Sequence, residues 1–463
     1  MAGVARWRAP KRTAAVHAEI EPWERWLSID KASLTDSGGR RAVVVRSAPG
    51  TRRGALGEAD GEKLAEAAAL AVKSRLPLVL VVASSGSDVT EGFGALHGWG
   101  RAAGAVAACS GIVPVLAAVT GPAVSGPALL LGLADIVAMT SSSFAFISGP
   151  EMVETFTGVR LGLSELGGPA VHTRSSGLAA FSANDEAGAL EMLADTLTFL
   201  PDDHDSLPPH LPPEDLPERP TPELADVVPA STRASYDVRD VVRSIADEGE
   251  LLELRAGFAP QMVTALARAG GYPVGFVANQ PRSLAGTLDI AASQKAARFV
   301  RFCDSFNLPL VTLVDTPGFL PGKDLEWRGM IRHGAELAFA YAEATVPRIA
   351  VILRKAYGGA YIVMDSKGLG NDICLAWPTA EIAVMGAEGA AQIIHRRADA
   401  EQRAKLESVY REKLLTPWVA AERGFVDEVI DPADTRAAVC RAVAVLSTRR
   451  ERLVGRKHDA GPL

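Results

Sequence analysis

The residues of this sequence that are best suited to chemistry form a short glycine turn in its second half. The turn 358–360 reads Gly-Gly-Ala, follows an apolar strand predicted at 349–353, and precedes helical residues. At the start of a helix the backbone N–H groups have no intrahelical acceptor, and the helix dipole places partial positive charge behind them. Glycines also let a ligand approach the backbone where a Cβ would obstruct it. The turn can therefore hold an oxyanion, although close packing between helix and strand explains the same glycines.

The first half of the chain contains a similar turn, with one difference in its hydrogen-bond donors. Residues 124–128 read Val-Ser-Gly-Pro-Ala, so Ser125 and Gly126 keep their N–H groups. Pro127 aligns with Ala360 in an internal repeat described below, and proline has no N–H to donate. If the hydrogen-bond donors of the two turns occupy equivalent positions of the repeat, the first turn lacks one donor. If Ser125 and Gly126 are the donors, Pro127 is simply a favourable first residue for the helix.

The sequence lacks motifs for other catalytic mechanisms. It has no GxSxG nucleophile elbow and no GxxxxGK[ST] phosphate loop, and its eight histidines are scattered. Four cysteines lie far apart without a CxxC pair or a nearby histidine, which argues against a disulfide framework and a zinc site. We therefore expect no metal in this chain. The loop 315–322, DTPGFLPG, has two Pro-Gly turns and suits a ligand pocket, although a plain chain reversal fits it equally well.

The composition limits the classes of protein to consider. The chain has 463 residues, of which 48% are hydrophobic and 22% charged, enough for about two to four domains with a large core. Its net charge of −7 argues against a protein that coats nucleic acid or an anionic membrane surface. The uncharged run 102–134 is interrupted by Gly and Pro, so it predicts a buried strand (113–119), a turn and a helix rather than a membrane span. Widely spaced cysteines and no visible secretory signal predict a cytoplasmic location.

The chain repeats itself internally. Four landmarks of the first half recur in the same order in the second half, at an offset of 232 residues that becomes 233 after one insertion. They are Gly-Ala-Leu at 54–56 and Gly-Thr-Leu at 286–288, Lys63 and Lys295, Leu-Pro-Leu-Val at 76–79 and 308–311, and Val-Pro at 113–114 and 346–347. Shared α/β periodicity alone is a weaker explanation for four landmarks in one order.

Each half contains the same succession of predicted elements. A Gly-x-Leu loop precedes an amphipathic helix, at 62–74 and 294–306, and a buried strand, a long excursion, a second buried strand and the small-residue turn follow. Strands that alternate with helices predict right-handed crossovers and a mostly parallel sheet. We therefore predict an α/β protein with two tandem domains of one fold, related by a pseudo-twofold axis.

A Pro-rich linker, 201–232, separates the two predicted domains. Proline and acidic residues are so dense up to Pro229 that we expect neither a helix nor a central strand there. The N-terminal domain then covers 1–200 and the C-terminal domain 233–463.

At these motifs the sequence closely resembles the carboxyltransferase (beta) subunit of biotin-dependent acyl-CoA carboxylases, of the propionyl-CoA or acetyl-CoA carboxylase type. The resemblance is dense over about 235–431 and is carried by long stretches such as NQPRSLAGTLDIAASQKAARFVRFCDSF, LVDTPGFLPG, RKAYGGAYIVM and AWPTAEIAVMGAEGAAQII. The first half matches more loosely, through GALGEADGEKL, FISGPEMVETFTG and SELGGPAVHTRSSG. The resemblance implies two crotonase-like (ClpP/crotonase) domains, in agreement with the repeat.

The resemblance implies transfer of a carboxyl group from carboxybiotin, carried on a separate protein, to the α-carbon of a short acyl-CoA. Acetyl-CoA or propionyl-CoA would give malonyl-CoA or methylmalonyl-CoA. In this family the biotin anion left after release of CO2 removes the α-proton, and two oxyanion holes stabilise the biotin and thioester enolates. By motif match the biotin-side hole falls on Gly359 and Ala360. The acyl-CoA-side hole falls on Ser125 and Gly126, where the family usually has two glycines.

The resemblance also assigns substrate-binding residues and partners. Ile362 takes a pocket position related to acyl choice, and Tyr357 and Gly358 are assigned with it. The other expected substrate-binding residues lie in two loops: Gly54, Ala55, Pro317, Gly318, Phe319 and Leu320. The implied partners are a biotin carboxylase and biotin carboxyl carrier subunit, with no nucleic acid and no membrane. Because this family's site lies where the N domain of one subunit faces the C domain of another, we expect a homo-oligomer, a dimer at least or a trimer of dimers, or a hetero-oligomer with a paralogue.

The first half departs from the family pattern on the acyl-CoA side. The usual DSGGARxxEG reads ASSGSDVTEG at 83–92, with an Asp where an Arg is expected, and the usual Gly-Gly beside the Gly-x-Leu loop is Arg52-Arg53-Gly54. The two arginines could meet CoA phosphates, although an exposed basic pair on a solvated loop is the simpler interpretation. Two further hypotheses stay open: a subunit that works with a paralogous carboxyltransferase chain as a partial scaffold, and an acyl-CoA decarboxylase or transcarboxylase of the same fold.

Overall fold

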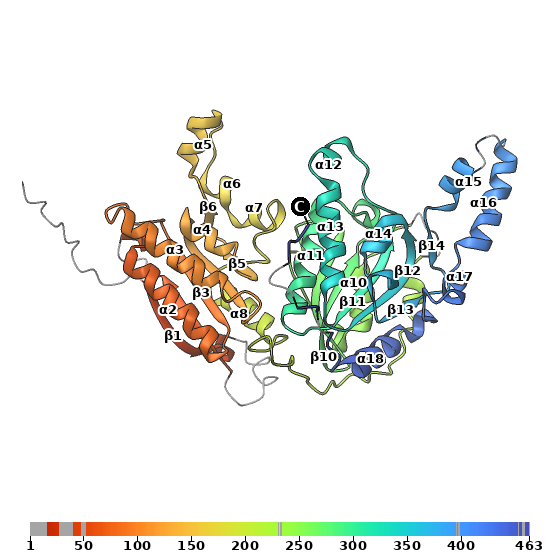
Figure 1. The fold of residues 1–463 in the computed structure, drawn as a ribbon, viewed down its shortest axis with the longest axis horizontal. Helices are drawn as coiled ribbons and strands as arrows, with labels where there is room; N and C mark the ends of the chain where they lie inside the picture. The colour runs from red at the N-terminus through yellow and green to blue at the C-terminus, as the bar shows by residue number, and fades with distance from the viewer. Residues whose placement is uncertain are drawn as a thin grey trace, which may run out of the picture. The chain divides into compact units, whose positions relative to one another are not determined.

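The computed structural model divides the chain into two compact units, each built around its own β-sheet (Figure 1). It describes residues 16–26, 40–47, 52–229, 231, 234–394, 396, 399–451, 453–455 and 459–462. Unit 1 consists of Met1–Thr198 with Asp202–Ser206, and unit 2 of Phe199–Pro201 with Leu207–Leu463. The predicted domain limits stay a prediction. The predicted start of the N-terminal domain and the predicted boundary between linker and C-terminal domain fall on residues 1–15 and 232–233, which lie outside the described residues.

Unit 1 is a mostly parallel sheet with helices packed against it. Its elements are β1 (Val16–Pro22), β2 (Arg41–Ser47), α2 (Glu58–Ser74), β3 (Leu78–Ser84), α3 (Phe93–Ala107), β4 (Val115–Val124), α4 (Gly126–Leu131), β5 (Ile136–Thr140), β6 (Phe144–Phe146), α5 (Pro150–Thr157), α6 (Leu163–Gly167), α7 (Pro169–Arg174), β7 (Phe181–Ala183) and α8 (Glu186–Leu197). The strand order is β1-β2-β3-β4-β5-β7, and β6 pairs with the end of β4. Strand β1 is antiparallel to β2, and the pairs from β2 onward are parallel. Helices α2 and α3 share a buried core with strands β2 to β5.

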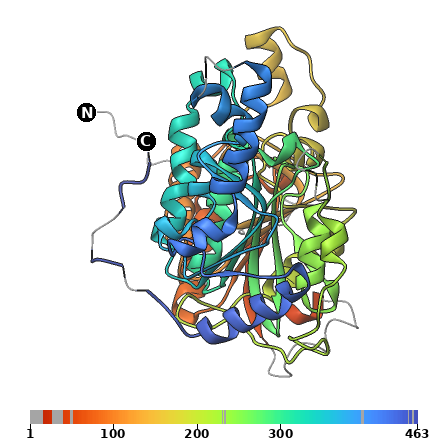
Figure 2. The ribbon, with the colours of Figure 1, turned by 90° about the vertical axis from the view of Figure 1, so that its right-hand side faces the viewer.

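Unit 2 repeats this plan with additional helices. Its elements are α9 (Leu224–Val227), α10 (Val238–Ile245), β8 (Leu251–Glu253), β9 (Met262–Ala269), β10 (Tyr272–Asn279), α11 (Ile290–Ser305), β11 (Leu310–Thr316), α12 (Lys323–Trp327), α13 (Met330–Glu343), β12 (Arg348–Tyr357), α14 (Gly358–Val363), β13 (Ile373–Ala376), β14 (Glu381–Ala383), α15 (Ala387–Ile394), α16 (Ala400–Leu414), α17 (Pro417–Glu422), β15 (Glu428–Val429) and α18 (Thr435–Leu446). The strand order is β15-β13-β12-β11-β10-β9-β8, with β14 paired to β12. Helices α10 and α18 share one buried core with the sheet, and Figure 2 shows α11 and α13 on the other side of the strands.

The two units agree residue by residue where the repeat predicts it, which confirms two parallel-sheet domains of one fold. Strand β3 pairs with β4 as β11 pairs with β12, and both pairings shift register at the same point, between Val82 and Ser84 and between Val314 and Thr316. Isolated parallel bridges join Leu56 to Ser87 in unit 1 and Leu288 to Phe319 in unit 2. The Gly-x-Leu loops therefore contact equivalent points of the loops that follow β3 and β11.

The predicted elements exist, and their ends are set by local capping. Helix α2 starts one turn before its predicted start because the Asp60 carboxylate accepts a 2.8 Å hydrogen bond from the Gly57 N–H. Asp289 caps α11 through a 2.7 Å hydrogen bond from a first-turn N–H. Strands β4 and β12 both run farther than predicted, up to the small-residue turns.

The strand predicted within the long uncharged run is buried, as expected. Residues Val115 to Val119 of β4 are fully buried in the sheet. No helix in the described ranges is both long and apolar enough to cross a membrane.

One expectation for the Pro-rich segment was wrong. Helix α9 (Leu224–Val227) forms inside it, in the stretch without proline between Pro222 and Pro229. Leu224 is fully buried in the core of unit 2, and the Thr221 N–H donates to the Ala433 carbonyl at 2.7 Å. Tertiary packing therefore stabilises a helix of four residues that has little stability of its own.

We predict that Gly61→Ala destabilises unit 1 while Gly104→Ala does not. A Cβ on Gly61 would lie 2.0 Å from the Gly98 carbonyl oxygen, so helices α2 and α3 must separate. A Cβ on Gly104 of α3 meets nothing within 4 Å. We expect a loss of about 1–3 kcal/mol for the first change and a gain of up to about 1 kcal/mol for the second, measured by urea unfolding. Equal effects of the two changes would contradict this packing.

Candidate functional site

The turn of unit 2 connects strand β12 directly to helix α14. Tyr357 ends the strand in an extended conformation, and Gly358 follows with a φ of 58°, a conformation that glycine adopts most readily. A Cβ on Gly358 would lie 3.0 Å from the Val384 carbonyl oxygen. The N–H groups of Gly358, Gly359 and Ala360 belong to the first turn of α14, so they have no acceptor within the helix.

The predicted loop 317–320 lies beside this turn. The Phe319 ring is 3.5 Å from the position that a Cβ on Gly359 would take, and 3.3 Å from that on Gly334 of α13. Hydrogen bonds from Leu288 N–H to the Gly318 carbonyl (3.1 Å) and from Leu320 N–H to the Leu288 carbonyl (2.8 Å) hold the loop. Pro317, Gly318, Phe319 and Leu320 are all partly exposed. The structure therefore brings this loop and the turn together, as a pocket requires.

A buried ionic cluster lies just before the turn. The Asp315 carboxylate accepts hydrogen bonds from Arg354 Nε (3.0 Å), Tyr236 Oη (2.9 Å) and Lys355 N–H (3.1 Å). Arg354 also donates to backbone carbonyls, and both members of the ion pair are almost fully buried. Sequence reasoning missed this cluster, although Arg-Lys-Ala directly before Tyr-Gly-Gly-Ala was a visible signal. Burial lowers the pKa of the Lys355 ammonium, which lies in β12 three residues before Gly358.

The remaining residues assigned to unit 2 frame α14. Tyr357 Oη donates to the Glu381 carboxylate, and burial, followed by this hydrogen bond, raises the pKa of the Tyr357 phenol. The phenol therefore stays protonated and acts as a fixed donor. Ile362 lies on α14 with 46% of its surface exposed, which leaves its side chain available to a ligand.

The turn of unit 1 has fewer free donors than expected. Ser125 has φ 59° and ψ −121°, a region that favours glycine, and its N–H donates to the Phe146 carbonyl at 3.0 Å. We expected Ser125 and Gly126 to supply two donors, but this hydrogen bond extends the pairing of β4 with β6 and engages the first of them. Gly126 begins α4, so its N–H has no acceptor within the helix, and Pro127 has none to give.

Trp99 of α3, which sequence reasoning also missed, packs against this turn. A Cβ on Gly126 would lie 2.6 Å from Cδ1 and 2.8 Å from Nε1 of the indole, so the ring occupies the space where a side chain would be. Among the described residues the buried Trp99 Nε1 has no hydrogen-bond partner. No local pattern around Trp99 indicates this contact, because it joins residues far apart in the sequence.

The Gly-x-Leu loop of unit 1 lies against the end of β3. Gly54 has a φ of 70°, and a Cβ on it would lie 2.2 Å from the Ala83 carbonyl oxygen. Ala55 is buried, whereas Arg53 is exposed. Asp88, where the resemblance led us to expect an arginine, is buried and accepts hydrogen bonds from Thr90 N–H (3.0 Å) and Thr90 Oγ1 (2.7 Å). Asp88 therefore caps its own loop. Gly54 allows the close approach of two backbone segments, and Ala55 packs inside the unit.

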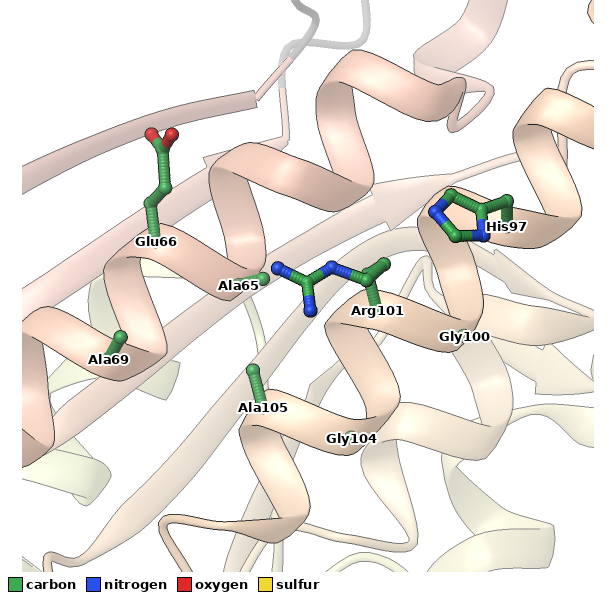
Figure 3. Close-up of a pocket in the computed structure, with 8 residues that line it drawn as sticks. All are labelled: Ala65, Glu66, Ala69, His97, Gly100, Arg101, Gly104 and Ala105. Carbon is green, nitrogen blue, oxygen red and sulfur yellow. The ribbon is translucent and has the colours of Figure 1, made fainter.

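A separate pocket of about 670 Å³ lies between helices α2 and α3 (Figure 3). Arg101, which lines it, forms an exposed ion pair with Glu62. None of the site residues predicted from the sequence lines this pocket, which is formed by Ala65, Glu66, Ala69, His97, Gly100, Arg101, Gly104 and Ala105.

The described residues offer neither a metal centre nor a reactive thiol. No group of three or more His, Cys, Asp or Glu side chains among them could hold a metal ion. Burial raises the pKa of Cys109 to about 11 and that of Cys374 to about 12, so these thiols stay protonated. The chemical groups that both turns have in common are therefore backbone N–H donors.

Comparison with known proteins agrees with this arrangement. The carboxyl transferase domain family matches residues 34–460. The chain is 46% identical over 444 residues to the propionyl-CoA carboxylase beta chain of Saccharopolyspora erythraea, covering 92% of this chain and 81% of that one. It is 44% identical over 416 residues to the methylmalonyl-CoA carboxyltransferase 12S subunit of Propionibacterium freudenreichii subsp. shermanii, covering 88% and 79%. A crystal structure of transcarboxylase 12S with methylmalonyl-CoA bound superimposes with a TM-score of 0.90 at 44% identity, over 92% of this chain and 83% of that chain.

The family match spans nearly the whole chain, and the solved relative shares its crotonase-like carboxyltransferase fold. The chain therefore belongs to the carboxyl transferase domain family and is a carboxyltransferase of the propionyl-CoA and methylmalonyl-CoA carboxylase type.

Proposed function

We propose that this enzyme moves a carboxyl group from carboxybiotin, held on a separate carrier protein, to the α-carbon of acetyl-CoA or propionyl-CoA. The observation that carries the proposal is the duplicated strand–turn–helix. Each unit ends a parallel strand in a turn whose first helical N–H groups have no intrahelical acceptor. Two such turns suit a reaction in which negative charge develops on two oxygens, one of a ureido group and one of a thioester.

The turn of unit 2 is proposed for the biotin side. Carboxybiotin, when bound, supplies the carboxyl group and the base that removes the α-proton. The chain's own part is to hold the ureido oxygen at the N–H groups of Gly359 and Ala360. Gly358 and Gly359 have no Cβ to obstruct it, and the Phe319 ring beside Gly359 offers a flat apolar wall for the biotin rings. Tyr357 directly precedes helix α14, and Ile362 lies in the same helix, four residues after Gly358.

The turn of unit 1 is proposed for the thioester oxygen of the acyl-CoA. Gly126 supplies the free backbone donor, because the Ser125 N–H is engaged and Pro127 has none. The Trp99 indole of α3 packs against Gly126. The turn therefore holds the oxygen through one backbone hydrogen bond.

The partners and assembly are proposed from the relatives. A biotin carboxylase and biotin carboxyl carrier subunit would supply the carboxybiotin. The solved transcarboxylase 12S is described as a hexamer, which supports a homo-oligomer of this chain. The cytoplasmic location stays a prediction. A transcarboxylase reaction is the second candidate, because one relative is a methylmalonyl-CoA carboxyltransferase.

We predict that the purified chain converts methylmalonyl-CoA or malonyl-CoA to the decarboxylated acyl-CoA only when free biotin is present. The reverse reaction needs both turns but no partner protein, so it can be followed as acyl-CoA formation by chromatography. Release of CO2 without biotin would favour a decarboxylase. Activity that appears only after a second carboxyltransferase chain is added would favour the scaffold hypothesis. Inactivity under every condition, including an acyl-CoA panel with a biotin-loaded partner, would refute the proposal.

Ala360→Pro should lower kcat of this reaction by about 100- to 1000-fold, because it removes one oxyanion donor. The fold tolerates proline at this point, since Pro127 occupies the equivalent position after β4. Pro127→Ala is the matched control: it adds an N–H and removes none, so activity should not fall. Circular dichroism checks that both variants fold. Full activity of a folded Ala360→Pro enzyme would exclude Ala360 as a donor.

Ser125→Gly should stabilise unit 1 by about 1 kcal/mol without loss of activity, because it relieves a positive φ at a residue with a Cβ. The N–H that donates to Phe146 is unchanged by this substitution. Ser164→Gly in helix α6 is the control and should cost about 0.5–1 kcal/mol. The urea unfolding midpoints of both variants, with the biotin-dependent assay, decide the outcome. A destabilised Ser125→Gly protein would show that the serine side chain has a structural role.

A further inference from the structure

A buried ion pair joins the first residue of β12 to the segment that follows helix α14. Arg348 Nη1 donates to the Asp365 carboxylate at 2.9 Å, and both side chains are almost fully buried. Arg348 also donates to the Leu369 carbonyl at 3.1 Å and to the Gly370 carbonyl at 2.6 Å. The other carboxylate oxygen of Asp365 accepts a 3.0 Å hydrogen bond from Asn371 Nδ2. The far end of α14 is therefore tied to the start of the strand that precedes it.

This cluster has costs that ordinary core packing avoids. The φ of Asp365 is 57°, in the left-handed region that favours glycine, and a residue stays there only where its surroundings fix it. Among the described residues the buried atoms Arg348 Nε, Ser366 Oγ and Asn371 Oδ1 have no hydrogen-bond partner. Backbone strain and unpaired buried groups are typical of sites where geometry serves function.

Unit 1 builds the same strand, turn and helix without such a pair. At the repeat offset of 233, Val115 and Gly132 stand where unit 2 has Arg348 and Asp365. The backbone contact at the start of the strand is common to both units, since its first N–H donates to an aspartate carboxylate at 3.0 Å in unit 1 and 2.9 Å in unit 2. The fold therefore forms without the ion pair.

Backbone hydrogen bonds connect the cluster to helix α14. The Ala360 carbonyl accepts from Met364 N–H at 3.2 Å. The Ile362 carbonyl accepts from Ser366 N–H at 3.4 Å. The two donating residues flank Asp365 in the sequence. A helix of six residues has little stability of its own, so its direction depends on the contacts at its two ends.

We propose that Asp365 is a positioning residue for the biotin-side turn and acts through its ion pair with Arg348. The pair fixes the end of α14, and the helix transmits this position to the N–H groups of Gly359 and Ala360 in its first turn. This inference rests on the proposed function, in which those N–H groups hold the ureido oxygen. Loss of the pair leaves the fold and misdirects the donors.

The test compares Asp365→Asn with Asp247→Asn in the biotin-dependent reaction of the full-length chain with malonyl-CoA, at about pH 8. Burial raises the pKa of Asp365 to about 6, so its carboxyl is ionised at that pH. Asparagine tolerates the same left-handed backbone. Asp247 is the matched control, because it forms an equally buried pair with Arg436, at 2.7 Å, between α18 and the turn after α10.

Both variants should unfold at lower urea concentration than the wild type, but only Asp365→Asn should lower kcat. A displacement of the donors by about 1 Å corresponds to a loss of up to about 100-fold, and we expect at least tenfold, with KM for malonyl-CoA within about twofold. The double variant Arg348→Met/Asp365→Asn leaves no uncompensated charge. It should recover stability while kcat stays low, and it replaces the single variant if that one does not fold.

Hydrogen exchange gives a readout that does not need activity. The Met364 and Ser366 amides should exchange at least tenfold faster in Asp365→Asn and at the wild-type rate in Asp247→Asn. Unchanged exchange at these amides, a full kcat in a folded Asp365 variant, or an equal loss of kcat in both single variants would overturn the inference. An inactive wild type would refute the proposed function, while the exchange rates would still decide whether Asp365 positions α14.

Discussion

The geometry of the second turn depends on the buried carboxylate of Asp315. It ties the end of β11 to the end of β12 through the Arg354 guanidinium, at 3.0 Å, and the Lys355 N–H, at 3.1 Å, three residues before Gly358. Breaking a buried ion pair by removing one partner typically costs about 3–5 kcal/mol, because the other charge is left uncompensated. The strand ends can therefore move little relative to each other. The loop that carries Phe319 and the turn that carries Gly359 start from these two fixed ends.

In unit 1 the position equivalent to Asp315 carries no charged side chain. Ala83 stands where unit 2 has Asp315, and the contact that remains is backbone packing of Gly54 on the Ala83 carbonyl, supported by a 2.6 Å hydrogen bond from Ser84 Oγ to the Gly54 carbonyl. The Ser85 N–H also donates to the Arg53 carbonyl at 3.1 Å. A junction held by packing and such uncharged hydrogen bonds lacks the ion pair that fixes the strand ends in unit 2. The departures from the family pattern fall on this loop, and Asp88 shows how one of them is accommodated, as a cap for Thr90.

The repeat in the sequence predicted most of the fold, because it records contacts that both units share. The strands and helices that both units share follow from it, and the structure adds a register shift common to the pairs β3/β4 and β11/β12, which the sequence did not predict. Of the candidate site, the sequence indicated only local features, such as the turn at 358–360. The Phe146 carbonyl that engages the Ser125 N–H and the Trp99 ring that covers Gly126 come from distant segments. No spacing or periodicity encodes such contacts, so the donor count at the first turn could not be read from the sequence.

In the proposed function the two turns therefore contribute unequally to oxyanion stabilisation. Each oxyanion donor contributes about 3–4 kcal/mol to transition-state stabilisation in favourable cases, and the turn of unit 2 keeps N–H groups at both Gly359 and Ala360. In the turn of unit 1 the Ser125 N–H is engaged and Pro127 has no N–H, which leaves the Gly126 N–H as the proposed donor. A single hydrogen bond fixes the position of an oxygen but not its orientation. Orientation of the acyl group must then come from the shape of the walls around Gly126, so changes in packing there should alter the choice of acyl-CoA more than equivalent changes around Gly359.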